Sequence, residues 1–225
     1  MTTMLEADPA LIARWAGAWA ISRGAAMPVP RNGGLYIHVG QPEQVGRYIF
    51  AGLDRTPIRD LAVTIDQPLL YLKVCAPADA VGPLLPPGWE IATPGYMMTA
   101  PVAAMLDRPP TLPAGFAVYI ARQGAVTFAT VTDPAGEEAA RGRIIAVGDL
   151  VVFDRIRTAD AHQRRGLATA IMRSLAAEAD ALGVRDAMLC ATPPGRALYT
   201  TLGWSLHSDY ATASLAPKNC ATMTT

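Results

Sequence analysis

The sequence predicts an α/β fold: a mixed, mostly antiparallel sheet with helices on both faces, plus an N-terminal α/β extension. Short apolar or alternating runs typical of strands recur along the 225-residue chain, and some of them pair as hairpins across short turns. Helical spacing of apolar residues marks fewer segments, near the N-terminus and after residue 166. A strand, a helix and a further strand follow one another near the C-terminus, as in an α/β fold.

The composition is that of a globular protein with a substantial core. About half of the residues are apolar, 17% are charged, and lysine plus arginine equal aspartate plus glutamate at 19 each. Without a basic surplus, nucleic acid is not an expected partner. The cysteines Cys75, Cys190 and Cys220 are widely spaced, so neither a disulfide framework nor a zinc site is expected, and no metal is assigned. Cys75 and Cys190 lie in apolar runs, and we expect both to be buried.

The N-terminal residues do not have the basic-then-apolar order of a signal peptide. No uninterrupted apolar run reaches the roughly 18 residues that span a bilayer. The expectation is therefore a cytoplasmic protein without a membrane partner.

Residues 1–66 form the expected extension, whose role the sequence does not define. An Asp-Pro pair opens a helix over 7–23, in which Leu11, Trp15 and Trp19 form an apolar face. Strands are expected over 35–40 and 47–52, followed by a short helix over 57–65. This extension could lengthen the sheet, form a wall of a substrate site or make the contact of a homodimer.

Residues 67–216 form the main expected domain, and 217–225 a flexible tail. Strands are expected over 69–75, 116–123, 125–133, 186–192 and 204–215, and one long or two short strands over 143–158. The proline-rich stretch 76–115 is not assigned. Helices are expected over 167–183, ended by Gly183, and over about 194–202. Leu167, Ile171, Leu175 and Leu182 mark the buried face of the first.

A cluster of positive charge lies where a strand meets the 167–183 helix. The residues are Gln163-Arg164-Arg165-Gly166-Leu167-Ala168. The first turn of a helix leaves about four backbone amides unpaired and carries about half a positive charge. A glycine at that point lets an anion approach the amides closely. The motif therefore predicts an anion site, although two exposed arginines at an ordinary turn are the alternative.

This motif resembles the coenzyme A pyrophosphate loop, Q/R-x-x-G-x-G/A, of the GNAT superfamily of acyl-CoA-dependent N-acetyltransferases. The resemblance covers residues 67–216. Upstream, DRIRTADAHQRRGLA is similar to the strand and turn of that family, and downstream GRALYTTLGW is similar to its FYxxLGF segment. It implies a GNAT-like sheet that splays after the DRIRT strand to admit the coenzyme.

The resemblance also implies acetyl-CoA as co-substrate and a set of residues that hold it. The backbone amide of Ile156 would meet the acyl carbonyl, and Thr158 would pair with the pantetheine arm. The remaining coenzyme-binding residues are Gln163, Arg164, Arg165, Gly166, Leu167, Ala168, Thr169 and Thr192. Ala168 replaces the usual second glycine, and Thr192 stands where many members have asparagine.

Two side chains are carried over as catalytic. Tyr199 would protonate the departing thiolate, and its alternative role is packing. Asp154 occupies the position of the family's general base; its alternative is a structural salt bridge to Arg155, Arg157 or another cation. Asp149 is a weaker candidate base. A carboxylate in an apolar strand is costly unless it is paired or functional.

The resemblance thus implies transfer of an acetyl or short acyl group from acyl-CoA to a primary amine, by direct attack in a ternary complex. A small-molecule acceptor is preferred, because no acidic run suited to lysine-rich tails is present. The alternatives are a module that binds acyl-CoA with little turnover, and an N-acetyltransferase acting on a protein or peptide.

Overall fold

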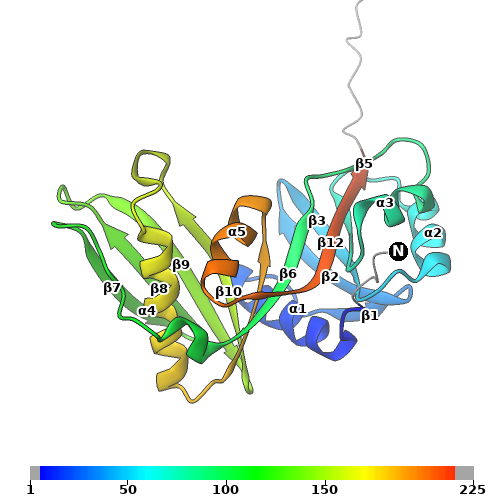
Figure 1. Cartoon of the computed structure of the whole chain (residues 1–225). Coiled ribbons are helices and arrows are strands. Elements are labelled where there is room, and N and C mark those ends of the chain that lie inside the picture. Colours follow the sequence, from blue (N-terminus) through cyan, green and yellow to red (C-terminus); the bar gives the residue numbers. More distant parts are fainter. Residues whose placement is uncertain (1–5, 216–225) are drawn as a thin grey trace, which may run out of the picture.

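The computed structural model describes residues 6–215. Twelve strands form one open sheet in the order β1-β2-β3-β4-β12-β6-β11-β10-β9-β8-β7, and β5 pairs with β12. Figure 1 shows β6 and β12 running between two groups of strands, one from each part of the chain. All neighbouring strands are antiparallel except β3 with β4 and β10 with β11. The predicted mixed, mostly antiparallel sheet is confirmed; the predicted tail, 217–225, lies outside the described residues.

The elements have the following bounds. The strands are β1 (Val29–Arg31), β2 (Gly34–Gln41), β3 (Gln44–Phe50), β4 (Leu70–Val74), β5 (Trp89–Ile91), β6 (Gly95–Pro101), β7 (Ala117–Gln123), β8 (Val126–Thr132), β9 (Glu138–Val147), β10 (Leu150–Thr158), β11 (Asp186–Ala191) and β12 (Ser205–Leu215). The helices are α1 (Pro9–Arg23), α2 (Arg55–Thr64), α3 (Ala78–Val81), α4 (Leu167–Ala181) and α5 (Pro193–Thr201), with 3-10 turns η1 (Gly82–Leu84), η2 (Val102–Met105) and η3 (Asp160–His162).

Helix α1 begins and ends as the sequence predicts. The Asp8 carboxylate accepts hydrogen bonds from the amides of Ala10 and Leu11, and Gly24 follows the helix at φ +61°. The burial differs from the prediction of a single apolar face: Ala16, Gly17 and Ser22 are buried as well as the two tryptophans. The reason is that α1 packs against β2, β9 and β10, and so lies between strands from both parts of the chain.

The first parallel pair forms a β-α-β unit over residues 44–74. Strand β3 pairs in parallel with β4, and α2 connects them. The expected boundary near residue 66 falls inside this unit, so residues on its two sides share one sheet. The N-terminal region therefore extends the sheet, which is one of the three roles considered for it.

Strand β6 comes from the proline-rich stretch that the sequence left unassigned. It lies between β11 and β12 and is antiparallel to both. Its neighbour β12 is long enough to serve both groups of strands: residues 205–210 pair with β6, and 211–213 pair with β4. Each group of strands is thus completed by a strand that lies far away in the sequence.

The second parallel pair forms a β-α-β unit over residues 150–191. Two strands joined at Gly148, rather than one long strand, occupy 143–158, and β9 begins earlier than predicted, at Glu138. Helix α4 then leads to β11, which pairs in parallel with β10. Leu182 was predicted to be buried but is 46% exposed, because it follows the last helical residue and Gly183 turns the chain there at φ +74°.

Helices cover both faces of the sheet, as predicted. Along β10, Val151 and Phe153 pack in the core beneath α4, whereas Leu150 and Val152 pack beneath α1. This alternation follows from the two-residue period of a strand. A third core lies between α2 and strands β3 and β4. Within residues 6–215, no helix has both the length and the apolar character needed to cross a membrane.

Candidate functional site

The predicted anion loop adopts the backbone conformation of a cradle. Arg164 has φ +63° and Gly166 has φ +79°, both in the left-handed region, and α4 begins at the next residue, Leu167. Gly166 occupies the N-cap position, and no side chain caps the amides of the first turn. A Cβ atom at Gly166 would meet no protein atom within 4 Å, so the space beside this residue is open. The helix therefore presents unpaired donors to this space.

A groove of about 600 Å³ runs past this helix start; we call it the outer groove. It is lined by Ile156, Thr158, Gln163, Arg164, Gly166, Leu167, Ala168, Thr169, Thr192, Pro194, Gly195, Ala197, Leu198, Tyr199 and Thr201. Of the twelve predicted site residues, ten are in this lining. The hydroxyl oxygen of Thr158 is buried without a hydrogen-bond partner in the described part of the chain. A buried hydroxyl without a partner is consistent with a hydrogen bond to a ligand that lies along the groove.

Arg165 is one of the two predicted residues outside this lining. It lies on a neighbouring hollow of about 470 Å³ together with Arg108 and Arg173. Arg173 forms an ion pair with Asp107 at 2.7 Å, whereas the Arg165 side chain is exposed. The two arginines of the motif therefore face different spaces.

The sheet opens where strand β10 carries a bulge. Parallel pairing with β11 ends at Phe153, and the register with β9 shifts between Asp154 and Arg157. Arg155 within the bulge has φ +53°. The sequence predicts that the sheet splays after DRIRT (154–158). In the structure, β10 and β11 already separate at Asp154, the first residue of that segment. Gly142 in β9 leaves room for the Ile156 side chain of the bulge, because a Cβ atom there would lie 2.5 Å from the Cδ1 atom of Ile156.

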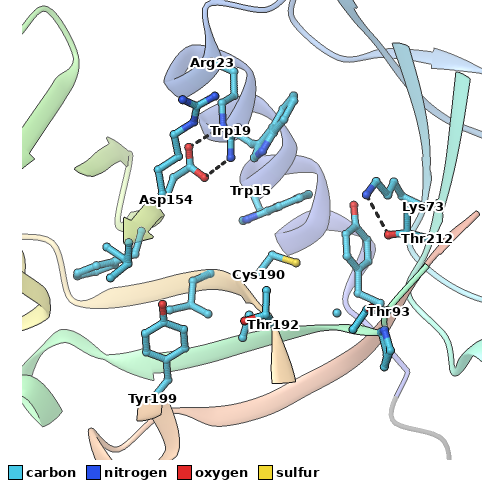
Figure 2. Close-up of a pocket in the computed structure, with 18 of the residues that line it drawn as sticks. Trp15, Trp19, Arg23, Lys73, Thr93, Asp154, Cys190, Thr192, Tyr199 and Thr212 are labelled. Atoms are coloured by element: carbon cyan, nitrogen blue, oxygen red, sulfur yellow. Dashed lines mark hydrogen bonds and ion pairs between the residues drawn. The ribbon is translucent and has the colours of Figure 1, made fainter. Parts of the chain in front are cut away.

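A second cavity, of about 390 Å³, lies behind the opening; we call it the inner cavity (Figure 2). Its walls come from α1, β3, β4, β10, β11, α5 and β12, together with residues 93–95. Ile156, Thr192 and Tyr199 line both the inner cavity and the outer groove. The two spaces therefore meet at these three residues, and the N-terminal region forms part of the inner wall.

Tyr199 is buried at this junction, with 7% of its surface exposed. Its ring packs against Trp204, with 6.1 Å between the ring centroids. Burial, with smaller contributions from Cys190 and Asp154, raises the pKa of Tyr199 to about 12. The phenol is therefore protonated at neutral pH.

Thr192 lies at the same junction and begins helix α5. Its hydroxyl accepts a hydrogen bond from the amide of Gly195 at 3.3 Å. This capping role is the local reason for a threonine before two prolines. The hydroxyl can still donate toward the groove, because a cap uses it only as an acceptor.

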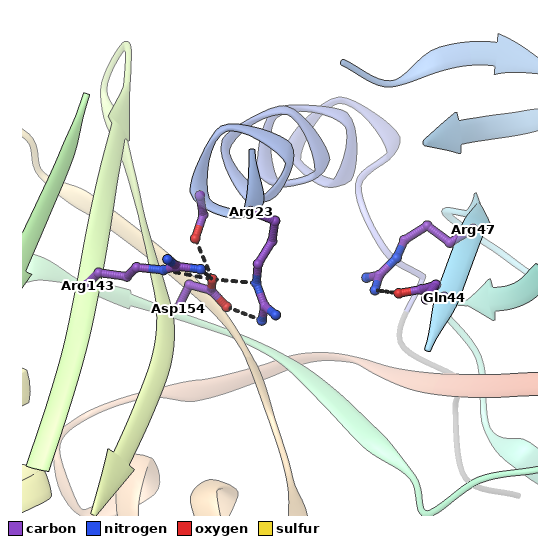
Figure 3. Close-up of polar contacts among 6 residues, drawn as sticks. Arg23, Gln44, Arg47, Arg143 and Asp154 are labelled. Atoms are coloured by element: carbon purple, nitrogen blue, oxygen red, sulfur yellow. Dashed lines mark hydrogen bonds and ion pairs between the residues drawn. The ribbon is translucent and has the colours of Figure 1, made fainter. Parts of the chain in front are cut away.

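Asp154 lies in the inner cavity and is held by ion pairs (Figure 3). Both of its oxygens accept hydrogen bonds from Arg23 at 2.8 Å, and Arg143 and the Ser22 hydroxyl also donate to it. Burial alone would raise the pKa of Asp154, but the hydrogen bonds and charges of Arg23 and its neighbours outweigh this and lower it. The expected salt bridge exists, but with Arg23 and Arg143 rather than Arg155 or Arg157.

Asp149, considered as an alternative base, lines neither the inner cavity nor the outer groove. Its side chain is 75% exposed and pairs with Arg14 on α1. Cys190, expected to be a buried apolar residue, is instead exposed on the cavity wall. The thiol lies on an interior cavity, and desolvation there raises its pKa to about 11.

Sequence reasoning missed the cations that the N-terminal half contributes to this cavity. Arg47 of β3 and Lys73 of β4 are in its lining, and Trp15 and Trp19, interpreted as packing residues, line it as well as packing. A charged residue within an apolar strand was the signal used for Asp154. The same signal was present in RYIF and LYLKV but was not used there.

No protein-family model and no curated protein sequence matches this chain. Solved structures do match it. A GCN5-related N-acetyltransferase from Kribbella flavida superposes with a TM-score of 0.64 at 14% identity, over 93% of this chain and 97% of that one. A GCN5-related N-acetyltransferase-like protein from Streptococcus suis has a TM-score of 0.57 at 15% identity, over 77% and 80% of the two chains.

A tandem GNAT protein from the clavulanic acid biosynthesis pathway matches with a TM-score of 0.52 at 14% identity, over 82% of this chain and 74% of that one. At these identities the likeness concerns the fold. The similarity to the Kribbella protein includes the N-terminal region, because it spans nearly all of both chains. The chain has the fold of the GNAT superfamily, the GCN5-related N-acetyltransferases.

Proposed function

We propose that this protein is an acyltransferase that moves an acetyl or short acyl group from acyl-CoA to the primary amine of a small molecule, within a ternary complex. One observation carries the proposal. The outer groove, which begins at a helix start suited to a pyrophosphate, meets the inner cavity at Ile156, Thr192 and Tyr199. A thioester in the groove and an amine in the cavity would therefore come together at one point.

The residues of the groove fit acyl-CoA, which supplies an activated acyl group as its thioester. The first-turn amides of α4 would bind the pyrophosphate, with Gly166 leaving room for the phosphate oxygens. The unpaired hydroxyl of Thr158 would gain a partner along the pantetheine arm. Arg165, beside Arg108 and Arg173, adds positive charge next to the groove.

Two groups at the junction suit the charge changes of acyl transfer. The bulge leaves Ile156 out of the β9 register, so its amide is a candidate donor to the oxygen that becomes negative during attack. Tyr199 holds its proton at neutral pH and would donate it to the departing thiolate.

The acceptor must also lose a proton, because only a neutral amine can attack the thioester. The paired Asp154 is a weaker base than a free aspartate, because Arg23 and Arg143 stabilise its charged form. We propose that Asp154 mainly positions these arginines; its role as general base stays a prediction. The cations of the inner cavity would themselves lower the pKa of a bound ammonium group and favour the neutral amine that attacks.

Two alternative functions make different use of the same spaces. A module that only binds acyl-CoA would not need an inner cavity that meets the groove beside a buried tyrosine. A protein acetyltransferase for lysine-rich tails would need an acidic acceptor surface, whereas four of the five charged residues that line the described inner cavity are cationic. The observations thus favour a small acceptor and turnover.

The test is release of free coenzyme A from acetyl-CoA, measured with a thiol reagent against a panel of small primary amines. We expect amine-dependent release, and a product whose mass shows a single added acetyl group. Acetyl-CoA binding without release for any amine, or release only with lysine peptides, would contradict the proposal.

A further inference from the structure

The charges of the inner cavity are not balanced. Its lining holds Arg23, Arg47, Lys73 and Arg155, and among the described residues Asp154 is the one carboxylate there. That carboxylate is already paired with Arg23 and with Arg143, which lies outside the lining. The positive charges of Arg47, Lys73 and the exposed Arg155 are therefore left without an acidic partner in the cavity.

Arg47 is held rigidly although it has no carboxylate. Its guanidinium lies over the ring of Trp19, with 3.6 Å from its central carbon to the ring centroid, and it donates to the side-chain oxygen of Gln44. Only 8% of the Arg47 surface is exposed, and desolvation lowers its pKa. The stacking and the hydrogen bond fix the position of the charge but do not neutralise it.

Lys73 lies on the neighbouring strand, and its ammonium donates to the hydroxyl of Thr212 at 2.9 Å. Burial, together with the charges of Arg47 and Arg23, lowers the pKa of Lys73 to about 7. Figure 2 shows Lys73 and Thr212 on the opposite side of the view from Tyr199. The ammonium of Lys73 thus lies away from the junction with the outer groove, whereas Arg155 is next in the sequence to Ile156 of that junction.

Two polar atoms of this region also lack partners. Within residues 6–215, neither the Nε atom of Arg47 nor the hydroxyl of Tyr210 has a hydrogen-bond partner, although both are buried. The ring of Tyr210 lies 5.8 Å from the Lys73 ammonium. Unpaired buried donors are costly, and natural proteins keep few of them without a functional reason.

We infer that the acceptor is an acidic amine, whose carboxylate or phosphate group binds between Arg47 and Lys73 while its amine reaches the junction at Ile156, Thr192 and Tyr199. The placement of the amine at the junction rests on the proposed function, whereas the anion site between Arg47 and Lys73 does not depend on it. An anion at this end would balance two desolvated cations and accept the unused hydrogen bonds. A cavity of about 390 Å³ suits a molecule the size of an amino acid.

The first experiment compares acceptors that differ only in the acidic group. The pairs are glycine with glycinamide, γ-aminobutyrate with butylamine, and phosphoethanolamine with ethanolamine. We expect the acidic member of at least one pair to have a kcat/KM roughly 10- to 100-fold higher, the range of charge-assisted hydrogen bonds. The first two pairs report on carboxylate and the third on phosphate. Equal or better use of all the neutral members would overturn the inference while leaving the acyltransferase proposal intact.

The second experiment removes the cation and does not depend on turnover. Lys73→Met keeps an unbranched side chain one atom shorter but deletes its charge, and Arg59→Met on the exposed surface of α2 is the matched control. Because it removes a partly buried charge that has no acidic partner, we expect Lys73→Met to fold with an unchanged or higher Tm. It should lose at least roughly tenfold in affinity for the acid, whereas the control should lose none.

Proton uptake gives a signature that a purely structural lysine would not produce. The groups facing Lys73 are Arg23 of α1, Arg47 of β3, Tyr71 of β4, Cys190 of β11, and Tyr210 and Thr212 of β12. A bound anion raises the pKa of Lys73 from about 7, so binding should take up protons above that pH and almost none below it.

Calorimetry at about pH 6 and about pH 8, in buffers of different ionisation enthalpy, measures this uptake. Butyrate and dimethyl phosphate serve as probes, because each keeps a single negative charge across this pH range and neither has an amine that titrates. We expect an uptake approaching one proton at the higher pH in the wild type and in Arg59→Met, but not in Lys73→Met. Binding of both probes unchanged by Lys73→Met, or no binding of either, would overturn the inference even if acetyl transfer to other amines is found.

Discussion

The molecule contains two β-α-β units with the same topology and different chemistry. In one, β3, α2 and β4 cover residues 44–74; in the other, β10, α4 and β11 cover 150–191. Each has a parallel pair of strands, and each pair is bordered by an antiparallel strand from the other part of the chain, β12 beside β4 and β6 beside β11. The backbone framework is therefore shared by the two units.

The loops that lead into the two helices differ. In the second unit, Gly166 precedes α4 and leaves the first-turn amides uncapped and open. In the first unit, Asp54 is the N-cap of α2 and Pro57, in the first turn, has no amide hydrogen to donate. An acidic residue and a missing donor do not suit a phosphate. The comparison indicates that loop chemistry, rather than topology, decides which unit is suited to binding an anion.

The largest expected effect comes from placing a negative charge in the loop of the second unit. Gly166→Asp and Gly166→Asn have the same shape, and both residues tolerate the left-handed conformation better than others do. We expect Gly166→Asp to weaken acetyl-CoA binding roughly a thousandfold relative to Gly166→Asn, because the carboxylate meets the pyrophosphate. Titration calorimetry measures both affinities.

The matched control for this pair lies in the first unit. Gly52 precedes α2 and also has open space around it. Gly52→Asp should leave coenzyme affinity unchanged. If Gly166→Asp binds acetyl-CoA as well as Gly166→Asn does, the coenzyme is not held at the start of α4. The difference between the loops before α2 and α4 would then have no bearing on coenzyme binding.

A smaller effect is expected at the junction of the two spaces. Tyr199→Phe removes the hydroxyl that helix α5, directly after the second unit, would offer to the thiolate, and kcat should fall roughly a hundredfold while the Kd for acetyl-CoA stays the same. Tyr48→Phe, in the core of the first unit, is the control. Steady-state kinetics with the best acceptor decides the matter: undiminished turnover in Tyr199→Phe would reduce Tyr199 to a packing residue.

The smallest effect concerns the ion pairs that tie α1 to the second unit. Asp154→Asn leaves Arg23 and Arg143 without their acidic partner, and we expect a loss of about 2 kcal/mol in the free energy of unfolding. Asp149→Asn breaks the exposed pair with Arg14 at the other end of β10 and should change it by less than about 0.5 kcal/mol. Urea unfolding measures both.

The pH dependence of this loss follows from the pKa of Asp154. Folding lowers this pKa, so the stabilising contribution is complete above the ordinary aspartate value of about 3.9 and disappears as the pH falls through the folded value. The gap between wild type and Asp154→Asn should therefore close in acid. In kinetics, a positioning role predicts a loss in kcat/KM that does not vary with pH. A loss that shrinks toward the pKa of the amine would identify Asp154 as the base instead.

The second unit and the helix α5 that follows it were predictable from the sequence because their signals are local. The glycine before α4, the helix spacing after it and the tyrosine segment are each read within a few residues, and ten of the twelve predicted site residues line the outer groove. Asp154 was placed in the right space, but its partners were not predicted. Arg23 lies 131 residues away, and no local pattern reveals such a pairing.

The inner cavity was not predictable for the same reason. It is built from α1, both β-α-β units and β12, whose contacts depend on strand pairings between distant segments. Strand β6 illustrates the difficulty: prolines surround it, yet tertiary pairing on both sides makes GYMMTAP a central strand. That Arg47 and Lys73 line one cavity with Asp154 becomes visible only once these strand pairings are known.

The exchange of β6 and β12 between the two groups of strands bears on how the chain matures during synthesis. Strand β4 is made early, but one of its neighbours, β12, consists of residues 205–215 and leaves the ribosome late. Until then the first unit has an open edge and an incomplete apolar surface, which is a liability for aggregation. The two halves should therefore acquire their native state in a single late event, and separately expressed halves should become soluble only when they are produced together.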